Sequence, residues 1–396
     1  MPPDRLSFLR RPTSRRTPTA VEFTYTTHHS ILMDSSSSTP RAITGIVICC
    51  RPGFEKDAAA ELTEYALIRG HAGYVTTTAE SGFVVLNLDE ECSFETINRN
   101  IRLAELIFAR QLGFRFGTAS HMPDDDRVSP IIELARCAPS RFSSITIETP
   151  DSDATKPLSG FCRRLSAPLG RAAEKANVLR PKRVHLPNLA ILFIGQGKAF
   201  LGINSADNRS PWPSGIPRLR MPKDAPSRST QKLAEAFVTL LSDTELEQRL
   251  RPGQRAVDLG AAPGGWTWQL AWRGLRVTAV DNGPMAASVM KTEMVTHVRA
   301  DGFKWRPPSA VEWMVCDMVE QPSRIAALVA DWVASGRCRH AIFNLKLPMK
   351  RRHEEIGRCR ELIGQRFAKA ALSYRLRLKQ LYHDREEITG FLEAIR

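Results

Sequence analysis

The stretch DLGAAPGGWTWQL, Asp258 to Leu270, decides the fold of the C-terminal half of this chain. An acidic residue ends a short apolar run, Gly260, Gly264 and Gly265 surround a tight turn, and an amphipathic segment follows. Glycine lets the backbone adopt conformations, and approach a ligand, in ways that other residues hinder. A strand, a glycine-rich turn and a helix in this order predict a ligand site at the carboxyl end of the strand.

The residues around that stretch alternate between strand-like and helical patterns from residue 228 onward. The expected strands are QRAVDLG, RVTAVDNG, VTHVRADGF, VEWMVCDMV and HAIFNLKLP, with the last strands in LRLKQLYHDREEITGFLEAI. Such alternation is typical of helices that cover both faces of a mostly parallel sheet. We therefore predict an α/β fold in which residues 228–396 form a Rossmann-like, doubly wound sheet.

The glycine spacing and three acidic residues indicate which ligand the turn binds. The dinucleotide pattern GxGxxG is broken after Gly260, and no lysine follows Gly265 as a phosphate-binding loop would require. Asp258, Asp281 and Asp301 end three successive expected strands. An acid in the position of Asp281 suits a pair of ribose hydroxyls, and Asp301 could reach an adenine edge. Each acid alone could be a turn or cap residue, but together they predict a site for S-adenosyl-L-methionine.

Motifs that the chain lacks exclude two classes of methyl acceptor. No Asp/Asn-Pro-Pro-aromatic loop for amine methylation follows the fourth strand, where the sequence reads CDMVEQP. Cys316 has no proline before it, and strand alternation puts its side chain opposite that of Asp317, so we expect it in the core. The remaining candidates for catalysis are Lys232, Asp317, Lys346 and Glu386.

Lys346 stands among apolar residues in IFNLKLP. Burial and a second ammonium group nearby would both lower the pKa of a lysine, so that it acts as a general base near neutral pH. Carboxylates would orient the ammonium groups. This combination predicts proton removal from a weak nucleophile such as a ribose 2′-hydroxyl, which attacks the methyl group of the sulfonium. The alternative is a partly exposed lysine at the end of a strand.

The first half of the chain carries no convincing catalytic constellation. Residues 45–205 are expected to form two small α+β units in tandem. Residues 206–227 contain five prolines and predict a linker, whose basic residues around Trp212 either contact a nucleotide strand or are merely solvated. Residues 1–41 are rich in Arg, Ser, Thr and Pro, and predict a disordered tail, a transit-like segment or an over-extended start, with Met33 as an internal start.

Composition limits the classes of partner. The 396 residues carry a formal net charge of +14, and the pI is about 9.7, which favours an acidic partner such as nucleic acid over the alternative of a protein that is simply basic. The sequence contains no apolar run of about 18 residues, so it predicts no membrane-spanning helix. The eight cysteines form no CxxC pair or zinc-type cluster. We therefore expect free thiols, no metal, no membrane contact, a cytoplasmic location and a monomer.

A set of motifs resembles one family over about residues 45–396, most densely over 214–389. The motifs are RPGFEKDAAAEL, DAPSRSTQKLAEAF, VDLGAAPGGWTWQL, VDNGPMA, DGFKWRP, WMVCDMVE, FNLKLPMKRR and LYHDREEIT. In order and spacing they resemble the RlmM family of bacterial 23S rRNA 2′-O-ribose methyltransferases. The resemblance implies a ferredoxin-like domain over 42–95, an RNA-binding THUMP domain over 96–205, the linker, and a Rossmann-like methyltransferase domain over 228–396.

The resemblance also implies roles for individual residues. Those that would contact S-adenosyl-L-methionine are Ser229, Ala262, Pro263, Gly264, Gly265, Asp281, Asp301 and Asp317. Lys346 would accept the proton, and the Lys-Asp-Lys-Glu pattern of 2′-O-methyltransferases matches Lys232, Asp317, Lys346 and Glu386. Glu387 is adjacent, so the choice between the two glutamates stays open, with Glu386 favoured. The residue at 262 is often cysteine in relatives.

The substrate and two alternative functions remain open at this point. The family target is a cytidine of 23S rRNA, position 2498, either in naked RNA or in an early precursor of the large subunit. One alternative is a methyltransferase that acts on another RNA or nucleotide. The other is an RNA-binding assembly protein with an inactive cofactor pocket, against which the presence of Asp281, Asp301, Asp317 and Lys346 argues.

Overall fold

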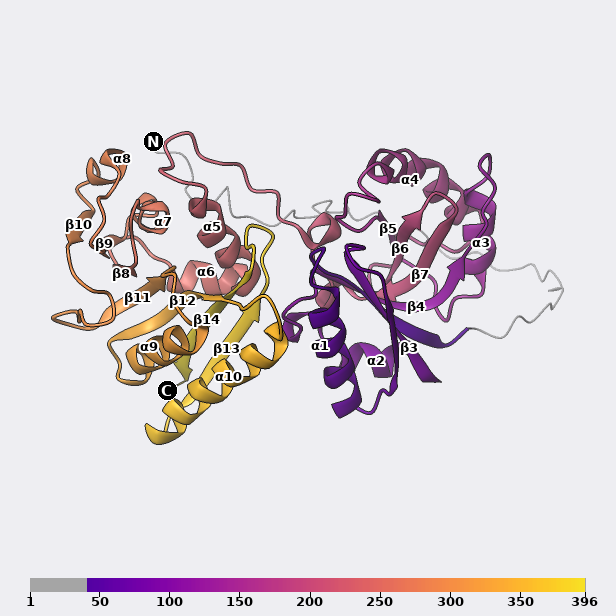
Figure 1. The fold of residues 1–396 in the computed structure, drawn as a ribbon. Coiled ribbons are helices and arrows are strands. Elements are labelled where there is room, and N and C mark those ends of the chain that lie inside the picture. The colour runs from indigo at the N-terminus through magenta and orange to yellow at the C-terminus, as the bar shows by residue number, and fades with distance from the viewer. Residues whose placement is uncertain (1–40, 396) are drawn as a thin grey trace, which may run out of the picture.

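The computed structural model describes residues 41–395. The expectations for residues 1–41 therefore lie, except for Arg41, outside the described residues. The described chain forms two α/β parts, each built on a seven-stranded sheet (Figure 1). No helix within residues 41–395 is both long and apolar enough to cross a membrane.

The N-terminal part has one continuous sheet with the strand order β2-β3-β1-β4-β7-β6-β5. Its strands are β1 (Ile43–Cys49), β2 (Gly73–Thr77), β3 (Phe83–Cys92), β4 (Gln111–Ala119), β5 (Ser144–Glu148), β6 (Asn188–Gly195) and β7 (Lys198–Asn204). Its helices are α1 (Glu55–Ile68), α2 (Phe94–Asn100), the short η2 (Leu103–Glu105), α3 (Val128–Arg136) and α4 (Leu158–Lys175). The two units expected in tandem thus share a sheet, because β4 pairs with β1 on one side and with β7 on the other.

The proline-rich segment expected as a linker is docked at its beginning. It contains η3 (Ala206–Asn208) and η4 (Pro213–Gly215). The buried Asn208 donates from Nδ2 to the carbonyl of Ile101 at 2.7 Å and accepts from Leu103 N at 2.8 Å. A Cβ on Gly215, whose φ is +72°, would lie 2.0 Å from the carbonyl oxygen of Arg110. This close approach seats the segment on the N-terminal part.

The C-terminal part confirms the predicted doubly wound architecture, with the strand order β10-β9-β8-β11-β12-β14-β13. Its strands are β8 (Arg255–Leu259), β9 (Arg276–Val280), β10 (Val295–Val298), β11 (Val311–Cys316), β12 (Cys338–Lys346), β13 (Ser373–Lys379) and β14 (Glu387–Ile395). Its helices are α5 (Ser229–Leu240), α6 (Asp243–Arg249), α7 (Gly265–Trp272), α8 (Ala287–Met290), α9 (Pro322–Ala334) and α10 (Arg352–Lys369). The five strands from β10 to β12 are parallel, and β14 runs antiparallel to both of its neighbours.

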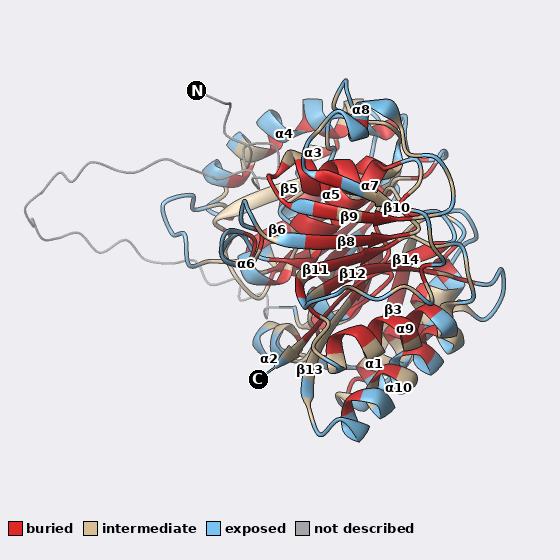
Figure 2. Cartoon of the chain, turned by 90° about the vertical axis from the view of Figure 1, so that its left-hand side faces the viewer, coloured by how far each residue is buried: buried red, intermediate tan, exposed pale blue. Residues whose placement is uncertain are grey.

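Apolar periodicity explains why these segments pack as they do. On α9, buried Ile325, Val329 and Trp332 recur at three- and four-residue intervals and face the sheet. The central strands β8, β11, β12 and β14 are largely buried on both faces, whereas the outer side of α10 is exposed (Figure 2). Cys316 is fully buried, as expected for a core residue.

The two parts meet where β13 approaches η2 and where α10 approaches α1. Lys379 Nζ donates to the carbonyl of Leu103 at 2.8 Å. Arg352, at the start of α10, donates to Asp57 of α1 at 3.0 Å and to Glu386 at 2.5 Å. Contacts with the N-terminal part therefore help to fix the turn between β13 and β14, residues 380–386, in addition to contacts within the C-terminal part.

Candidate active site

The glycine-rich turn between β8 and α7 touches two other elements closely. A Cβ on Gly260, whose φ is +77°, would lie 2.5 Å from the Met318 side chain in the loop after β11. A Cβ on Gly265 would lie 2.1 Å from Ser229 Oγ at the start of α5. Gly264 has a φ of +113° and caps α7. Larger residues at these positions would push the three elements apart, so the glycines let them converge at the carboxyl ends of β8 and β11.

Asp281 and Ser229 border this turn. Asp281 follows β9, and its carboxylate accepts hydrogen bonds from Ala262 N at 3.0 Å and from Gly283 N at 2.7 Å. The hydroxyl groups of Ser229 and Ser227 are 2.7 Å apart. The structure thus brings Ser229, the turn and Asp281 together.

Asp301 stays within its own loop after β10. It accepts from Phe303 N at 2.9 Å and lies 4.0 Å from Lys304 Nζ, with 46% of its side chain exposed. Its expected place at an adenine edge therefore remains a prediction.

Asp258 is a candidate that the sequence indicated only as the end of a strand. It is 1% exposed, and Oδ2 accepts from Thr267 Oγ1 at 2.6 Å. Oδ1 has no hydrogen-bond partner among residues 41–395. Burial raises the pKa of Asp258 to about 7, with the Thr267 hydrogen bond opposing this and the negative charge of Asp317 adding to it. The unpartnered oxygen could accept from a bound cationic group.

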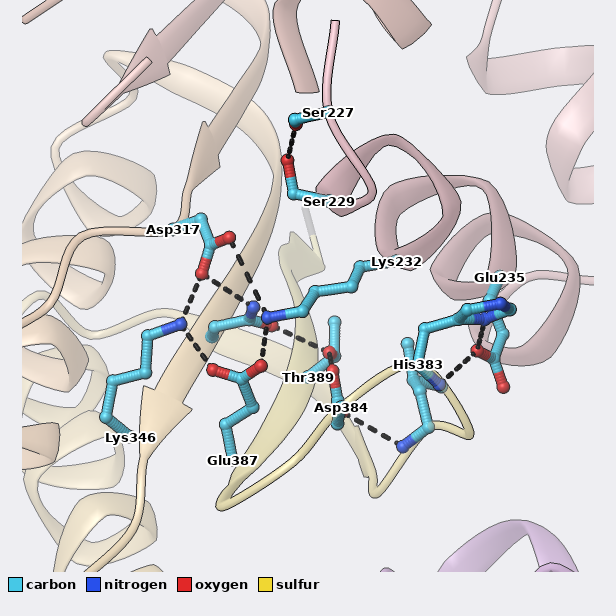
Figure 3. Close-up of polar contacts among 12 residues, drawn as sticks. Ser227, Ser229, Lys232, Glu235, Asp317, Lys346, His383, Asp384, Glu387 and Thr389 are labelled. Carbon is cyan, nitrogen blue, oxygen red and sulfur yellow. Dashed lines mark hydrogen bonds and ion pairs between the residues drawn. The ribbon is translucent and has the colours of Figure 1, made fainter. Parts of the chain in front are cut away.

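A cluster of four charged side chains lies beside the turn (Figure 3). Its members come from four elements: Lys232 from α5, Asp317 from the end of β11, Lys346 from the end of β12 and Glu387 from the start of β14. Lys346 Nζ donates to both Asp317 and Glu387, and Lys232 Nζ donates to Glu387. Lys232 Nζ is also 4.0 Å from Asp317 Oδ2. Two positive and two negative groups therefore alternate in this lysine–carboxylate cluster.

The glutamate of the lysine–carboxylate cluster is Glu387, which corrects the choice of Glu386. Glu387 pairs with Lys346 in the antiparallel register of β12 and β14, so the two side chains lie on the same face. The Glu386 side chain is 56% exposed and binds Arg352 instead. Adjacent residues entering a strand point to opposite sides, so only one of the two can reach the lysines.

The charge state of Lys346 also differs from the expectation. Burial lowers the pKa of Lys346, but Asp317 and Glu387 together outweigh burial and raise its pKa above the ordinary value. For Glu387, burial raises the pKa, and the two lysines outweigh burial and lower it. The prediction that burial and a second ammonium lower the pKa of Lys346 is therefore wrong, because Asp317 and Glu387 both accept hydrogen bonds from its Nζ.

Buried polar residues that the sequence analysis missed position the cluster. Asn344 donates from Nδ2 to Asp317 Oδ1 at 2.8 Å and accepts from Thr389 Oγ1 at 2.7 Å. Asn344 is two residues before Lys346 on β12, so strand alternation was the available signal. On α5, the buried Glu235 accepts from the backbone N–H groups of Tyr382 at 2.7 Å and His383 at 2.9 Å, which fixes the turn before Glu387.

Comparison with known proteins identifies the family. Residues 43–113 match the RlmM ferredoxin-like domain, residues 126–205 match the N-terminal region of ribosomal RNA large subunit methyltransferase M, and residues 225–371 match the FtsJ-like methyltransferase domain. The ribosomal RNA large subunit methyltransferase M of Thauera aminoaromatica is 54% identical over 355 residues, which cover 90% of this chain and 97% of that protein. The chain belongs to the ribosomal RNA large subunit methyltransferase M family. A relative with the same name from Aromatoleum aromaticum is 56% identical over 348 residues, 88% of this chain and 94% of its own.

Most residues of the candidate site lie within the region that matches the FtsJ-like methyltransferase domain. The FtsJ-like region contains the glycine turn, Asp281, Asp317 and Lys346. It ends at residue 371, before β14, so Glu387 lies outside the matched region. Within residues 41–395, no group of three or more His, Cys, Asp or Glu side chains could hold a metal ion.

Proposed function

We propose that this protein transfers a methyl group from S-adenosyl-L-methionine to a ribose 2′-hydroxyl of 23S rRNA, with Lys346 as proton acceptor. The observation that carries the proposal is the alternating cluster of Lys232, Asp317, Lys346 and Glu387 beside the glycine turn. The relatives are named for methylation of large-subunit ribosomal RNA. On the family resemblance, we propose that the target is the cytidine at position 2498.

The residues around the turn fit S-adenosyl-L-methionine. The glycines expose the backbone over Ala262, Pro263, Gly264 and Gly265, Asp281 offers a carboxylate to ribose hydroxyls, and the unpartnered Oδ1 of Asp258 suits an ammonium group. When bound, the cofactor supplies an electrophilic methyl group on a positively charged sulfur. Asp317 binds Lys346, and the next residue, Met318, contacts Gly260 of the turn. Asp317 would therefore lie close to both the cofactor and Lys346.

Proton transfer sets a requirement on Lys346. Its Nζ can accept the 2′-hydroxyl proton only as a neutral amine, whereas Asp317 and Glu387 favour the ammonium form. A further positive charge near Asp317, such as a sulfonium, favours the neutral amine because like charges repel. Lys232 stays bound to Glu387 and keeps that carboxylate in place. Lys346 would then become a base only after the cofactor binds.

We propose that the N-terminal part, residues 41–205, docks the RNA in the manner of a THUMP domain. Exposed basic residues support this role: Arg163, Arg164 and Arg171 on α4, and Arg180, Lys182 and Arg183 after it. Phosphate contacts position RNA without reading its sequence. Replacing Arg163 and Arg164 with alanine should weaken rRNA binding and make its salt dependence shallower. An unchanged salt slope would mean that these charges are only a solvated face.

We further propose that the protein acts as a cytoplasmic monomer on naked rRNA or on an early precursor of the large subunit. All eight cysteines are free thiols, which suits a reducing compartment. Incubating the protein with stripped rRNA and with precursor particles from a strain lacking the gene would distinguish the two substrates.

The decisive experiment is ribose-methylation mapping of total rRNA from a strain that lacks the gene. One 2′-O-methyl group should disappear from 23S rRNA. The wild-type gene should restore it, and a Lys346→Ala gene should not. An unchanged methylation map, or full restoration by Lys346→Ala, would overturn the assignment.

A further inference from the structure

A groove opens directly at Lys346, on the side away from the glycine turn. It lies between the N-terminus of α9 and one side of α10, and its volume is about 710 Å³. Its lining includes Gln321, Ser323, Lys346, Pro348, Glu355 and Arg358. None of the residues proposed to hold the cofactor lines it. A volume in this range is typical of sites that enclose a small molecule or a single nucleotide.

Two strongly exposed apolar side chains lie on the loops next to the lysine–carboxylate cluster and this groove. Val319 is 90% exposed in the loop after β11, two residues beyond Asp317. Met349 is 85% exposed in the loop after β12, three residues beyond Lys346. In sequence, each is next to a residue that lines the groove. Single exposed apolar residues are ordinary on protein surfaces, but a pair on the two loops that carry the reacting groups indicates contact with the substrate.

We propose that the groove holds the base of the nucleotide whose ribose is methylated, and that Val319 and Met349 keep that nucleotide out of the RNA stack. This inference rests on the proposed function. The base is attached to the carbon next to the one that carries the 2′-hydroxyl, so it must lie close to Lys346 when that hydroxyl reaches Nζ. The glycine turn borders the cluster on one side, and the groove is open on the other. Enzymes that act on single nucleotides extrude them into a pocket, and inserted apolar side chains separate stacked bases.

The polar lining indicates which bases fit. The Glu355 side chain is 16% exposed and lies 3.4 Å from Arg358 Nη1. A carboxylate accepts from an exocyclic amine, while a guanidinium donates to an adjacent ring nitrogen or carbonyl. Cytosine and adenine present an amine beside a ring acceptor, guanine presents an amine beside an N–H, and uracil presents only carbonyls beside an N–H. The groove therefore favours a base that carries an amine on its pairing edge.

The first test uses the full-length protein, labelled S-adenosyl-L-methionine and rRNA from a strain lacking the gene. The double variant Val319→Ser/Met349→Ser should lower kcat/KM for RNA by about 10-fold, because contact with an unstacked base contributes on that order. Its affinity for S-adenosyl-L-methionine should be unchanged, which also shows that it is folded. Ile395→Ser is the matched control, since Ile395 is 46% exposed and lies at the opposite end of β14 from Glu387. Equal kcat/KM in the double variant and the control would overturn the role of the two apolar residues.

The second test concerns the base. RNA transcripts that carry cytidine or uridine at the mapped position should differ by about 10-fold or more in rate with the wild-type protein, and Glu355→Gln should reduce that ratio. Glu354→Gln is the control, because Glu354 neighbours Glu355 on α10, is 58% exposed and does not line the groove. If Glu355→Gln leaves the cytidine-to-uridine rate ratio unchanged, the proposal that this groove recognises the base is overturned. If the wild-type protein methylates no rRNA at all, the proposed function itself has failed, which is a separate result.

Discussion

Replacing Glu387 with glutamine should separate its role from that of Glu386. The Glu387 carboxylate accepts hydrogen bonds from both Lys232 and Lys346 and is only 7% exposed. An amide retains one acceptor oxygen, so the variant loses about one charge-assisted hydrogen bond, worth about 1.5–3 kcal/mol. If that energy orients the lysines for transfer, the single-turnover rate should fall by about 10- to 150-fold. Calorimetry should find an unchanged affinity for S-adenosyl-L-methionine.

The pH profile of the same variant provides an independent readout. Glu387 is one of the two carboxylates that raise the pKa of Lys346. Removing its charge lowers that pKa, so the pH at which transfer reaches half of its maximum should move to lower values. Glu386→Gln is the matched control, because Glu386 is adjacent, 56% exposed and bound to Arg352. A rate loss in Glu386→Gln equal to that in Glu387→Gln, or a profile that does not move, would refute the reasoning.

Three further predictions concern the cofactor site, a buried acid and the junction. Asp281→Ala should weaken S-adenosyl-L-methionine binding by about 10- to 150-fold in calorimetry, through loss of a charged acceptor; unchanged affinity would move the ribose contact elsewhere. The pKa of Asp258 is raised to about 7 in the folded protein, so its stability contribution declines as pH rises from about 4 to 7. The melting temperature of Asp258→Asn minus that of the parent should therefore be larger at pH 8 than at pH 4. An equal difference at the two pH values would contradict this. Asp57→Asn should lower unfolding stability by about 1.5–3 kcal/mol, since Asp57 and Arg352 are 3.0 Å apart and each only 13% exposed; a denaturant midpoint equal to the parent's would show that the pair contributes little.

The glycine turn and the parallel sheet were predictable because their signals are local. Positive φ values at Gly260 and Gly264 follow from the glycine-rich motif, and alternating apolar segments predict β8 to β12 in order. Asp281 could be placed for the same reason, because it follows the apolar run of β9 directly.

The errors at the site came from contacts between distant parts of the chain. Whether Glu386 or Glu387 faces Lys346 depends on the residue at which β14 begins to pair with β12. The sequence next to the two glutamates does not indicate that register. The pKa of Lys346 depends on how close Asp317 and Glu387 approach, which is set by three strands and not by the apolar residues around the lysine. Asn344 was overlooked because its partners, Asp317 and Thr389, are 27 and 45 residues away.

The single sheet of the N-terminal part constrains how this half of the protein can be divided. The two family segments there, residues 43–113 and 126–205, look like separate modules along the sequence. Yet β4 is hydrogen-bonded along both edges, to β1 of the first segment and β7 of the second, and Gly202 on β7 leaves room for the β4 backbone at Phe114. Neither segment can be exchanged for a distant homologue, or expressed alone, without exposing one edge of a central strand. Evolution and protein engineering alike must therefore treat residues 43–205 as one inherited unit.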